Sequence, residues 1–113
     1  MGSTKWQALE VVYSARARRQ LNEIWDWNFA QYGEAHADGY IEFLQTGVDA
    51  LAKHPNRGKP VESRPGVRYY VIRRKSKGHA HIAIYSADEK FLNVSHIFHS
   101  AQNWRHEIES DLP

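Results

Sequence analysis

The chain has 113 residues, 42% hydrophobic and 12% aromatic, which is typical of one folded domain and unlike the aromatic-poor composition of disordered chains. It contains no cysteine, which excludes disulfides and thiolate metal sites. No stretch approaches the roughly 18 apolar residues of a membrane span, and the start lacks the apolar core of a signal peptide. We therefore expect a cytoplasmic protein without membrane contact and a single domain over residues 1–113, with residues 1–4 either disordered or tag-derived.

Positive charge is concentrated in the middle of the chain, although the formal net charge is only +2. Residues 57–81 carry eight Lys and Arg against one acidic residue, whereas the segments before and after them are acidic overall. Such a stretch fits an ordinary solvated hairpin, a surface for nucleic acid or a surface for an acidic protein. Charge alone leaves all three interpretations open.

The first half of the sequence predicts a strand and two helices. Residues 6–13 form a short apolar run rich in β-branched and aromatic residues, which is typical of a strand. A helix is then predicted from the cap Ser14 to Gly33, because apolar residues recur at steps of three, four and seven. That stripe consists of Ala17, Leu21, Ile24, Trp25 and Tyr32.

A second helix is predicted to end before Pro55 and to form an antiparallel hairpin with the first. Its apolar stripe consists of Tyr40, Leu44, Gly47, Val48 and Leu51. A glycine lowers helix propensity by about 1 kcal/mol relative to alanine, so Gly47 marks either a close helix crossing or a locally weak helix. We favour the close crossing.

The second half predicts three strands in a meander, because the apolar period changes from about 3.6 to 2 after the connection at residues 54–66. The strands are expected at residues 67–74, 79–86 and 91–98. Ser100 is a candidate cap for a short closing helix that carries Trp104 and Ile108 on one side. The result is an α+β fold of order β-α-α-β-β-β, with the helix hairpin on one face of a small, mainly antiparallel sheet and the other face free.

Strand alternation assigns side chains to the two faces of this sheet. The side expected to meet the helices carries Val67, Tyr69, Val71, Ala80, Ile82, Ile84, Leu92, Val94 and Phe98. The free side is expected to carry Arg68, Tyr70, Arg74, His79, His81, Tyr85, Asn93, Ser95 and His99. His96 falls on the apolar side, where we interpret it as a hydrogen-bonded core histidine without a chemical role.

The free face holds the groups that metal-independent RNA cleavage requires, which are an acid, a base and cations for the phosphate. The candidate acid and base groups are His81, Tyr85 and His99, although ordinary surface histidines would give the same pattern. His79 and His81 alternate along a strand as metal ligands do, but the chain offers no cysteine and no clear third ligand. We therefore predict no metal and no cofactor.

Several strings, in this order and spacing, resemble the ParE/RelE toxin superfamily of bacterial type II toxin-antitoxin systems over most of the chain. Residues 13–25 are similar to the family's strand exit and first helix, and residues 31–33 to the end of that helix. Residues 51–60 resemble the end of its second helix and the following Gly/Pro loop, and residues 64–69 the start of its second strand. Residues 95–99, with Asn103-Trp104-Arg105, resemble the last strand and tail of ParE-like members.

The resemblance implies the fold predicted above, growth arrest by the free toxin, and a hetero-oligomer with an antitoxin that wraps it. ParE-like members poison DNA gyrase, whereas RelE-like members cut mRNA in the ribosome. The Arg64–Arg68 segment and the Ile97–His99 ending favour ParE. The long basic hairpin at residues 73–81 exceeds the usual ParE connection and favours nucleic acid.

Three hypotheses follow. The first is a gyrase-binding toxin without chemistry of its own, and the second is a ribosome-dependent mRNA endonuclease. The third is an interaction module that is inert without its partner. The residues expected to contact the target or phosphate are Arg68, Arg73, Arg74, Lys75, Lys77, Trp104 and Arg105. For either toxin we expect the antitoxin to supply an amphipathic helix with acidic residues.

Overall fold

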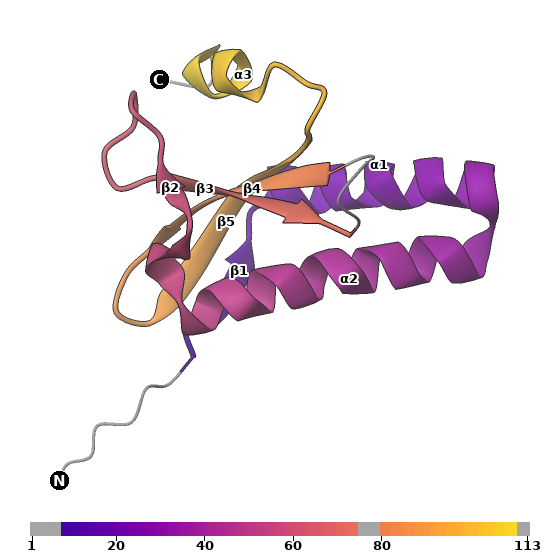
Figure 1. Cartoon of the computed structure of the whole chain (residues 1–113), viewed down its shortest axis with the longest axis horizontal. Helices are drawn as coiled ribbons and strands as arrows, with labels where there is room; N and C mark the ends of the chain where they lie inside the picture. The colour runs from indigo at the N-terminus through magenta and orange to yellow at the C-terminus, as the bar shows by residue number, and fades with distance from the viewer. Residues whose placement is uncertain (1–7, 75–79, 111–113) are drawn as a thin grey trace, which may run out of the picture.

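The computed structural model describes residues 8–74 and 80–110, which form a five-stranded sheet with helices on both of its faces (Figure 1). In chain order the elements are β1 (Glu10–Tyr13), α1 (Ala15–Tyr32), α2 (Glu34–Lys53), the 3-10 turn η1 (Pro55–Arg57), β2 (Lys59–Pro60), β3 (Arg68–Arg73), β4 (Ala80–Ala87), β5 (Phe91–His99) and α3 (Trp104–Ser110). The predicted α+β order is confirmed, with β2 as an addition. No helix in this described part is long and apolar enough to cross a membrane.

The sheet has the strand order β1-β5-β4-β3-β2 and is antiparallel except for the parallel pair β1 and β5. This confirms the mainly antiparallel sheet. β2 was predicted as part of a connection, because two residues are too few to show a period of 2. Lys59 pairs with Tyr69 and Pro60 with Arg68, so the proline lies in an edge strand, where its missing N–H is tolerated.

The helix hairpin begins and turns where the sequence predicts. The Ser14 hydroxyl oxygen accepts a hydrogen bond from the Ala17 N–H at 2.9 Å, and the hydroxyl donates to the Ser95 carbonyl at 2.7 Å. Gly33 ends α1 with a φ of 92°, a conformation that favours glycine, and its N–H donates to the Phe29 carbonyl. A single residue therefore joins the two helices, and the joined ends of the hairpin project beyond the sheet (Figure 1).

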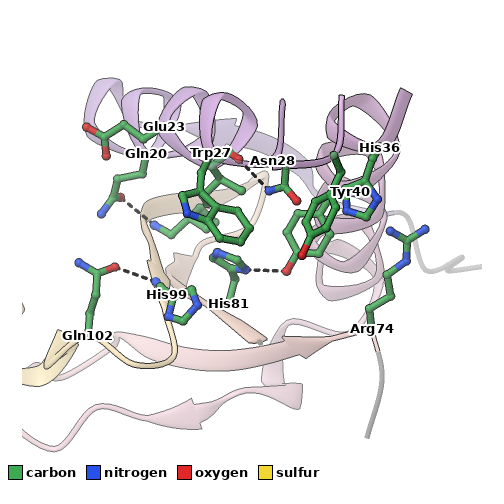
Figure 2. Close-up of a pocket in the computed structure, with 13 residues that line it drawn as sticks. Gln20, Glu23, Trp27, Asn28, His36, Tyr40, Arg74, His81, His99 and Gln102 are labelled. Carbon is green, nitrogen blue, oxygen red and sulfur yellow. Dashed lines mark hydrogen bonds between the residues drawn. The ribbon is translucent and has the colours of Figure 1, made fainter. Parts of the chain in front are cut away.

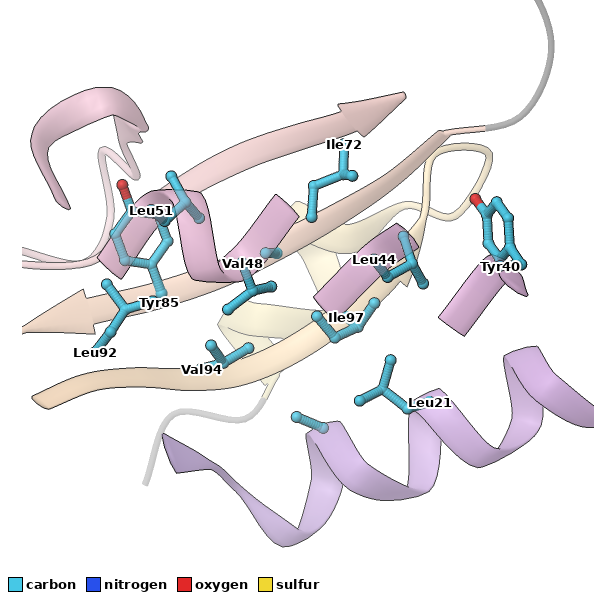
Figure 3. Packing of buried hydrophobic residues seen from close by; sticks show 12 residues of the cluster. Leu21, Tyr40, Leu44, Val48, Leu51, Ile72, Tyr85, Leu92, Val94 and Ile97 are labelled. Carbon is cyan, nitrogen blue, oxygen red and sulfur yellow. The ribbon is translucent and has the colours of Figure 1, made fainter. Parts of the chain in front are cut away.

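The main core lies between this hairpin and one face of the sheet (Figure 3). It consists of Ala17, Leu21, Tyr40, Leu44, Val48, Leu51, Ile72, Ala83, Tyr85, Leu92, Val94 and Ile97. A Cβ atom on Gly47 would lie 2.9 Å from Cγ2 of Ile72. Gly47 therefore marks the close approach of α2 to β3, and the expected crossing of two helices is wrong.

The opposite face of the sheet is covered, which corrects the expectation of a free face. A second core packs α3 against the sheet and consists of Val61, Ile82, Ile84, Phe98, Trp104 and Ile108. The helix begins at Trp104, so Ser100 is not its cap. The Arg64 guanidinium donates to the Ile108 carbonyl at 2.9 Å and so satisfies a carbonyl in the last turn of α3.

The faces predicted for β3 and β4 are reversed. Ile82 and Ile84 pack with α3, whereas His81 and Tyr85 point toward the hairpin. Tyr69 lies on the α3 side. Because both faces of the sheet are covered, apolar side chains occur on both, and alternation alone does not identify the hairpin side.

A bulge in β5 explains a further difference. Tyr85 pairs with Val94 and Ile84 with His96, which leaves Ser95 without an opposite residue. Leu92 and Val94 therefore face the hairpin as predicted, but Phe98 lies on the α3 side. His96 is half-buried, stacks on Phe98 and is hydrogen-bonded to the Ser95 hydroxyl at 2.8 Å, which confirms that it has a hydrogen-bond partner.

Candidate functional site

A cavity of about 540 Å³ opens between the projecting half of α1, the start of α2, the start of β4 and the end of β5 (Figure 2). We call it the hairpin pocket. Its apolar wall is formed by Ile24, Trp27 and Ile97, with Tyr32 at the end of α1. Trp27 is 50% exposed and Tyr32 61% exposed, so large aromatic surfaces are left uncovered at its rim. Such a concave surface, with an apolar wall and several polar side chains around it, is typical of a binding site.

The floor of the hairpin pocket contains a buried histidine-tyrosine pair. The Tyr40 hydroxyl lies 2.6 Å from Nδ1 of His81, which is only 5% exposed. Burial raises the pKa of Tyr40 above its ordinary value, and the nearby positive charge of Arg74 partly opposes this. The raised pKa favours the protonated phenol, whose hydroxyl is engaged in the hydrogen bond with His81.

His99 lies beside this pair, with its ring perpendicular to that of His81 at 5.2 Å between centroids. Its Nδ1 accepts a hydrogen bond from the Ala101 N–H at 3.0 Å. This hydrogen bond shows that Nδ1 acts as an acceptor.

Sequence reasoning missed Asn28, a buried polar residue in the wall of the hairpin pocket. It is 6% exposed, and its amide nitrogen donates to the Ile24 carbonyl at 2.8 Å. An asparagine four residues after Ile24, within an otherwise apolar stripe, was the available signal. Tyr40 was also missed as a site residue, because its place in the apolar stripe of α2 indicated only packing.

Tyr85 and Arg68 do not belong to the hairpin pocket. Tyr85 is 1% exposed, and its hydroxyl accepts from the Gly58 N–H at 2.9 Å and donates to the Pro55 carbonyl at 2.7 Å. Arg68 donates to the Gly58 carbonyl at 2.6 Å. Both side chains thus hold the loop after α2, so Tyr85 does not join His81 and His99, which the structure does bring together.

The predicted basic residues fall on two sides of the molecule. Arg74 lines the hairpin pocket and lies 5.5 Å from the centre of the Phe43 ring. On the other side, Arg105 lies 4.2 Å from the ring centre of Trp104 and 5.1 Å from that of Tyr69. Trp104 is itself buried, so it supports Arg105 and presents little surface of its own.

Two exposed residues of β3 extend this second surface. Alternation places Val71, which is 39% exposed, and Arg73 on the same side as Tyr69. We call Tyr69, Val71, Arg73 and Arg105 the β3–α3 surface. Lys75, Lys77 and His79 lie outside the described residues, as do the middle of the basic hairpin predicted at residues 73–81 and Trp6, the first residue of the predicted first strand.

Comparison with known proteins agrees with this architecture. The family model described as the ParE toxin of the type II toxin-antitoxin system parDE matches residues 11–104. Toxin ParE1 of Caulobacter vibrioides is 29% identical over 93 residues, which cover 81% of this chain and 90% of that protein. Toxin ParE1 of Mycobacterium tuberculosis is 38% identical over 56 residues, which cover 49% of this chain and 57% of that protein.

A solved structure described as the chromosomal ParDE toxin-antitoxin system from P. aeruginosa has a similar fold. Its TM-score is 0.66 at 20% identity, over 80% of this chain and 95% of the other. The family match ends at Trp104, the first residue of α3. Most of α3 therefore lies outside the part of the chain that the family model matches.

Proposed function

The chain belongs to the ParE toxin family of type II toxin-antitoxin systems, and on that premise we propose that it arrests growth by binding DNA gyrase. The proposal places it in the cytoplasm, where a cognate antitoxin holds it inactive in a hetero-oligomer. It acts by binding and carries out no chemistry of its own. The observation that carries this choice concerns Tyr85, one of the candidate acid or base groups for RNA cleavage. Its hydroxyl is buried and hydrogen-bonded to two backbone groups, so it is not presented to a substrate.

The β3–α3 surface supports a binding role. Arg105 is held against two aromatic rings, and Val71 presents apolar area beside Arg73. An arginine stacked on aromatic side chains, next to exposed apolar surface, has the composition that dominates protein interfaces. We propose that this surface contacts gyrase.

The hairpin pocket supports the antitoxin partner. Its apolar wall and exposed aromatic rim suit the apolar stripe of an amphipathic segment, and Arg74 suits an acidic residue of that segment. We propose that the antitoxin docks here.

The test is expression of this chain alone in bacteria, with incorporation of labelled thymidine and labelled methionine followed over the first minutes. DNA synthesis is expected to stop first, and the purified chain is expected to inhibit supercoiling by gyrase. Undisturbed supercoiling, with protein synthesis failing first, would remove gyrase as the target. Unaffected growth would instead favour the inert interaction module.

Ribosome-dependent mRNA cleavage is the second candidate, because one feature favours it. His81 and His99 lie ring to ring in the pocket that Arg74 also lines, and these are the residue types that cleave RNA. A His99→Ala variant separates the two functions in the same experiment. The variant should remain toxic if the chain binds gyrase, and should be harmless if it cuts mRNA.

A further inference from the structure

Asn28 is a buried polar residue in the wall of the hairpin pocket, and half of its side chain has no partner among the described residues. Its amide nitrogen is satisfied by the Ile24 carbonyl, but no donor among the described residues reaches its carbonyl oxygen. Figure 2 shows this oxygen on the side of the amide that faces Tyr40, across the pocket. The pocket therefore offers a hydrogen-bond acceptor that the isolated chain does not use.

Among the described residues, Nε of Arg64 is the buried side-chain atom without a partner, so water in the open pocket reaches the Asn28 oxygen. A leucine at position 28 would continue the apolar stripe of Leu21 and Ile24, whereas the asparagine places an acceptor in the pocket wall. A ligand that displaces this water must donate to the same oxygen, or it loses a hydrogen bond.

The shape and polarity around Asn28 define that ligand. Ile24, Ile97 and the half-exposed Trp27 ring require a flat, apolar group, whereas the Asn28 carbonyl requires an N–H or O–H on the same group. Among side chains, only the aromatic rings of tryptophan and tyrosine combine a large apolar body with such a donor.

The charged residues at the two ends of the hairpin pocket determine how a charged ligand is oriented in it. Arg74 lies at one end of the hairpin pocket and Glu23 at the other (Figure 2). No carboxylate in the described part of the chain forms an ion pair with Arg74, whose guanidinium lies 5.5 Å from the centre of the Phe43 ring. A carboxylate next to the bound ring is therefore favoured at the Arg74 end and disfavoured at the Glu23 end.

We propose that Asn28 selects the anchor of the antitoxin, an aromatic side chain with a hydrogen-bond donor whose segment places a carboxylate beside Arg74. This inference rests on the proposed docking of the antitoxin in the hairpin pocket. Asn28 acts as a specificity residue, because it discriminates a tryptophan or tyrosine from a phenylalanine or leucine at the anchor position.

The test titrates the full-length chain with small probes and follows backbone and side-chain amide signals by NMR. N-acetyl-L-tryptophanamide should shift the signals of the pocket residues, including the Asn28 amide. Its 1-methylindole analogue lacks the donor and should bind at least about fivefold more weakly, as expected for the loss of one hydrogen bond. Equal binding of the two probes, or no shift in the pocket with either, would overturn the inference.

Two substitutions sharpen this comparison. Asn28→Leu should abolish the difference between the two probes and raise the melting temperature, whereas Asn22→Leu, an exposed site on the same helix, should leave the difference intact. A persistent difference in Asn28→Leu would contradict the role of Asn28. If that variant does not fold, the comparison of the two probes on the wild-type chain decides the question.

The carboxylate is tested with N-acetyl-L-tryptophan, which differs from the amide by a negative charge. It should bind more tightly than the amide to the wild-type chain and no more tightly to Arg74→Gln. If the wild-type chain binds N-acetyl-L-tryptophan no more tightly than the amide, Arg74 has no part in the inference. These measurements use no antitoxin or gyrase, so their failure is distinct from failure of the growth-arrest experiment.

Discussion

Tyr85 shows how a residue suited to catalysis can instead hold a loop. Its hydroxyl joins the N–H of Gly58 to the carbonyl of Pro55, and burial raises its pKa above the ordinary value. A Cβ atom on Gly58 would lie 2.8 Å from the Tyr69 carbonyl, so only glycine fits against β3 there. The loop after α2 is therefore fixed in place by Tyr85, Gly58 and Arg68 together.

Tyr85→Phe is expected to lower the free energy of unfolding by about 1–3 kcal/mol, because the buried Gly58 N–H and the part-buried Pro55 carbonyl lose their hydrogen bonds to the hydroxyl. Urea denaturation measures the change. Tyr32→Phe is the matched control, since Tyr32 is 61% exposed and should unfold as the wild-type chain does. A Tyr85→Phe variant of unchanged stability but without toxicity would instead point to a direct functional role for the hydroxyl.

Local signals at single residues were predictable, whereas the chemistry of the pocket was not. Ser14 and Gly33 have conformational roles that depend only on their neighbours, and both lie where the sequence places them. Asn28, Tyr40 and His81 form a site only because the projecting hairpin and the sheet bring them together. Nothing in the spacing of these residues encodes that contact.

At the scale of elements, the sequence indicated which segments are helices and strands but not which face of each strand meets the hairpin. Two features made the orientation of the strand faces unpredictable from the sequence. The short α3 covers the second face of the sheet, so Ile82 and Ile84 are as apolar as the residues opposite them. The bulge at Ser95 then changes the phase of β5, and no residue type at that position predicts it.

The contribution of α3 can be measured at Ile108, which is 2% exposed and lies beyond the part of the chain that the family model matches. Ile108→Ala removes buried apolar contacts with the sheet and should lower the free energy of unfolding by about 2–5 kcal/mol. Glu109→Ala, at the exposed neighbouring position, should have little effect. If denaturation of Ile108→Ala matches the wild-type curve, α3 is not a structural part of the fold.

At the scale of the whole molecule, the proposed antitoxin site and the proposed gyrase site lie on opposite faces of one sheet. They meet at the end of β3, because Arg74 turns toward the hairpin pocket and the adjacent Arg73 toward the β3–α3 surface. An antitoxin segment bound along Arg74 therefore ends beside the surface that would contact gyrase. Neutralisation can then arise from a segment that continues past this sheet edge and covers the second face.

This arrangement predicts that toxicity and neutralisation are separable by mutation. Arg73→Ala combined with Arg105→Ala should raise the toxin concentration that halves gyrase supercoiling at least about tenfold, a loss of about 1.4 kcal/mol of binding, while antitoxin still co-purifies. Trp27→Ala should do the reverse, because it removes a wall of the hairpin pocket and leaves the β3–α3 surface intact. Arg18→Ala combined with Arg19→Ala removes the same charge from exposed positions of α1 and should change neither property. If the Arg73 and Arg105 substitutions weaken both functions equally, the two sites overlap, and the division of the molecule into an antitoxin face and a gyrase face is wrong.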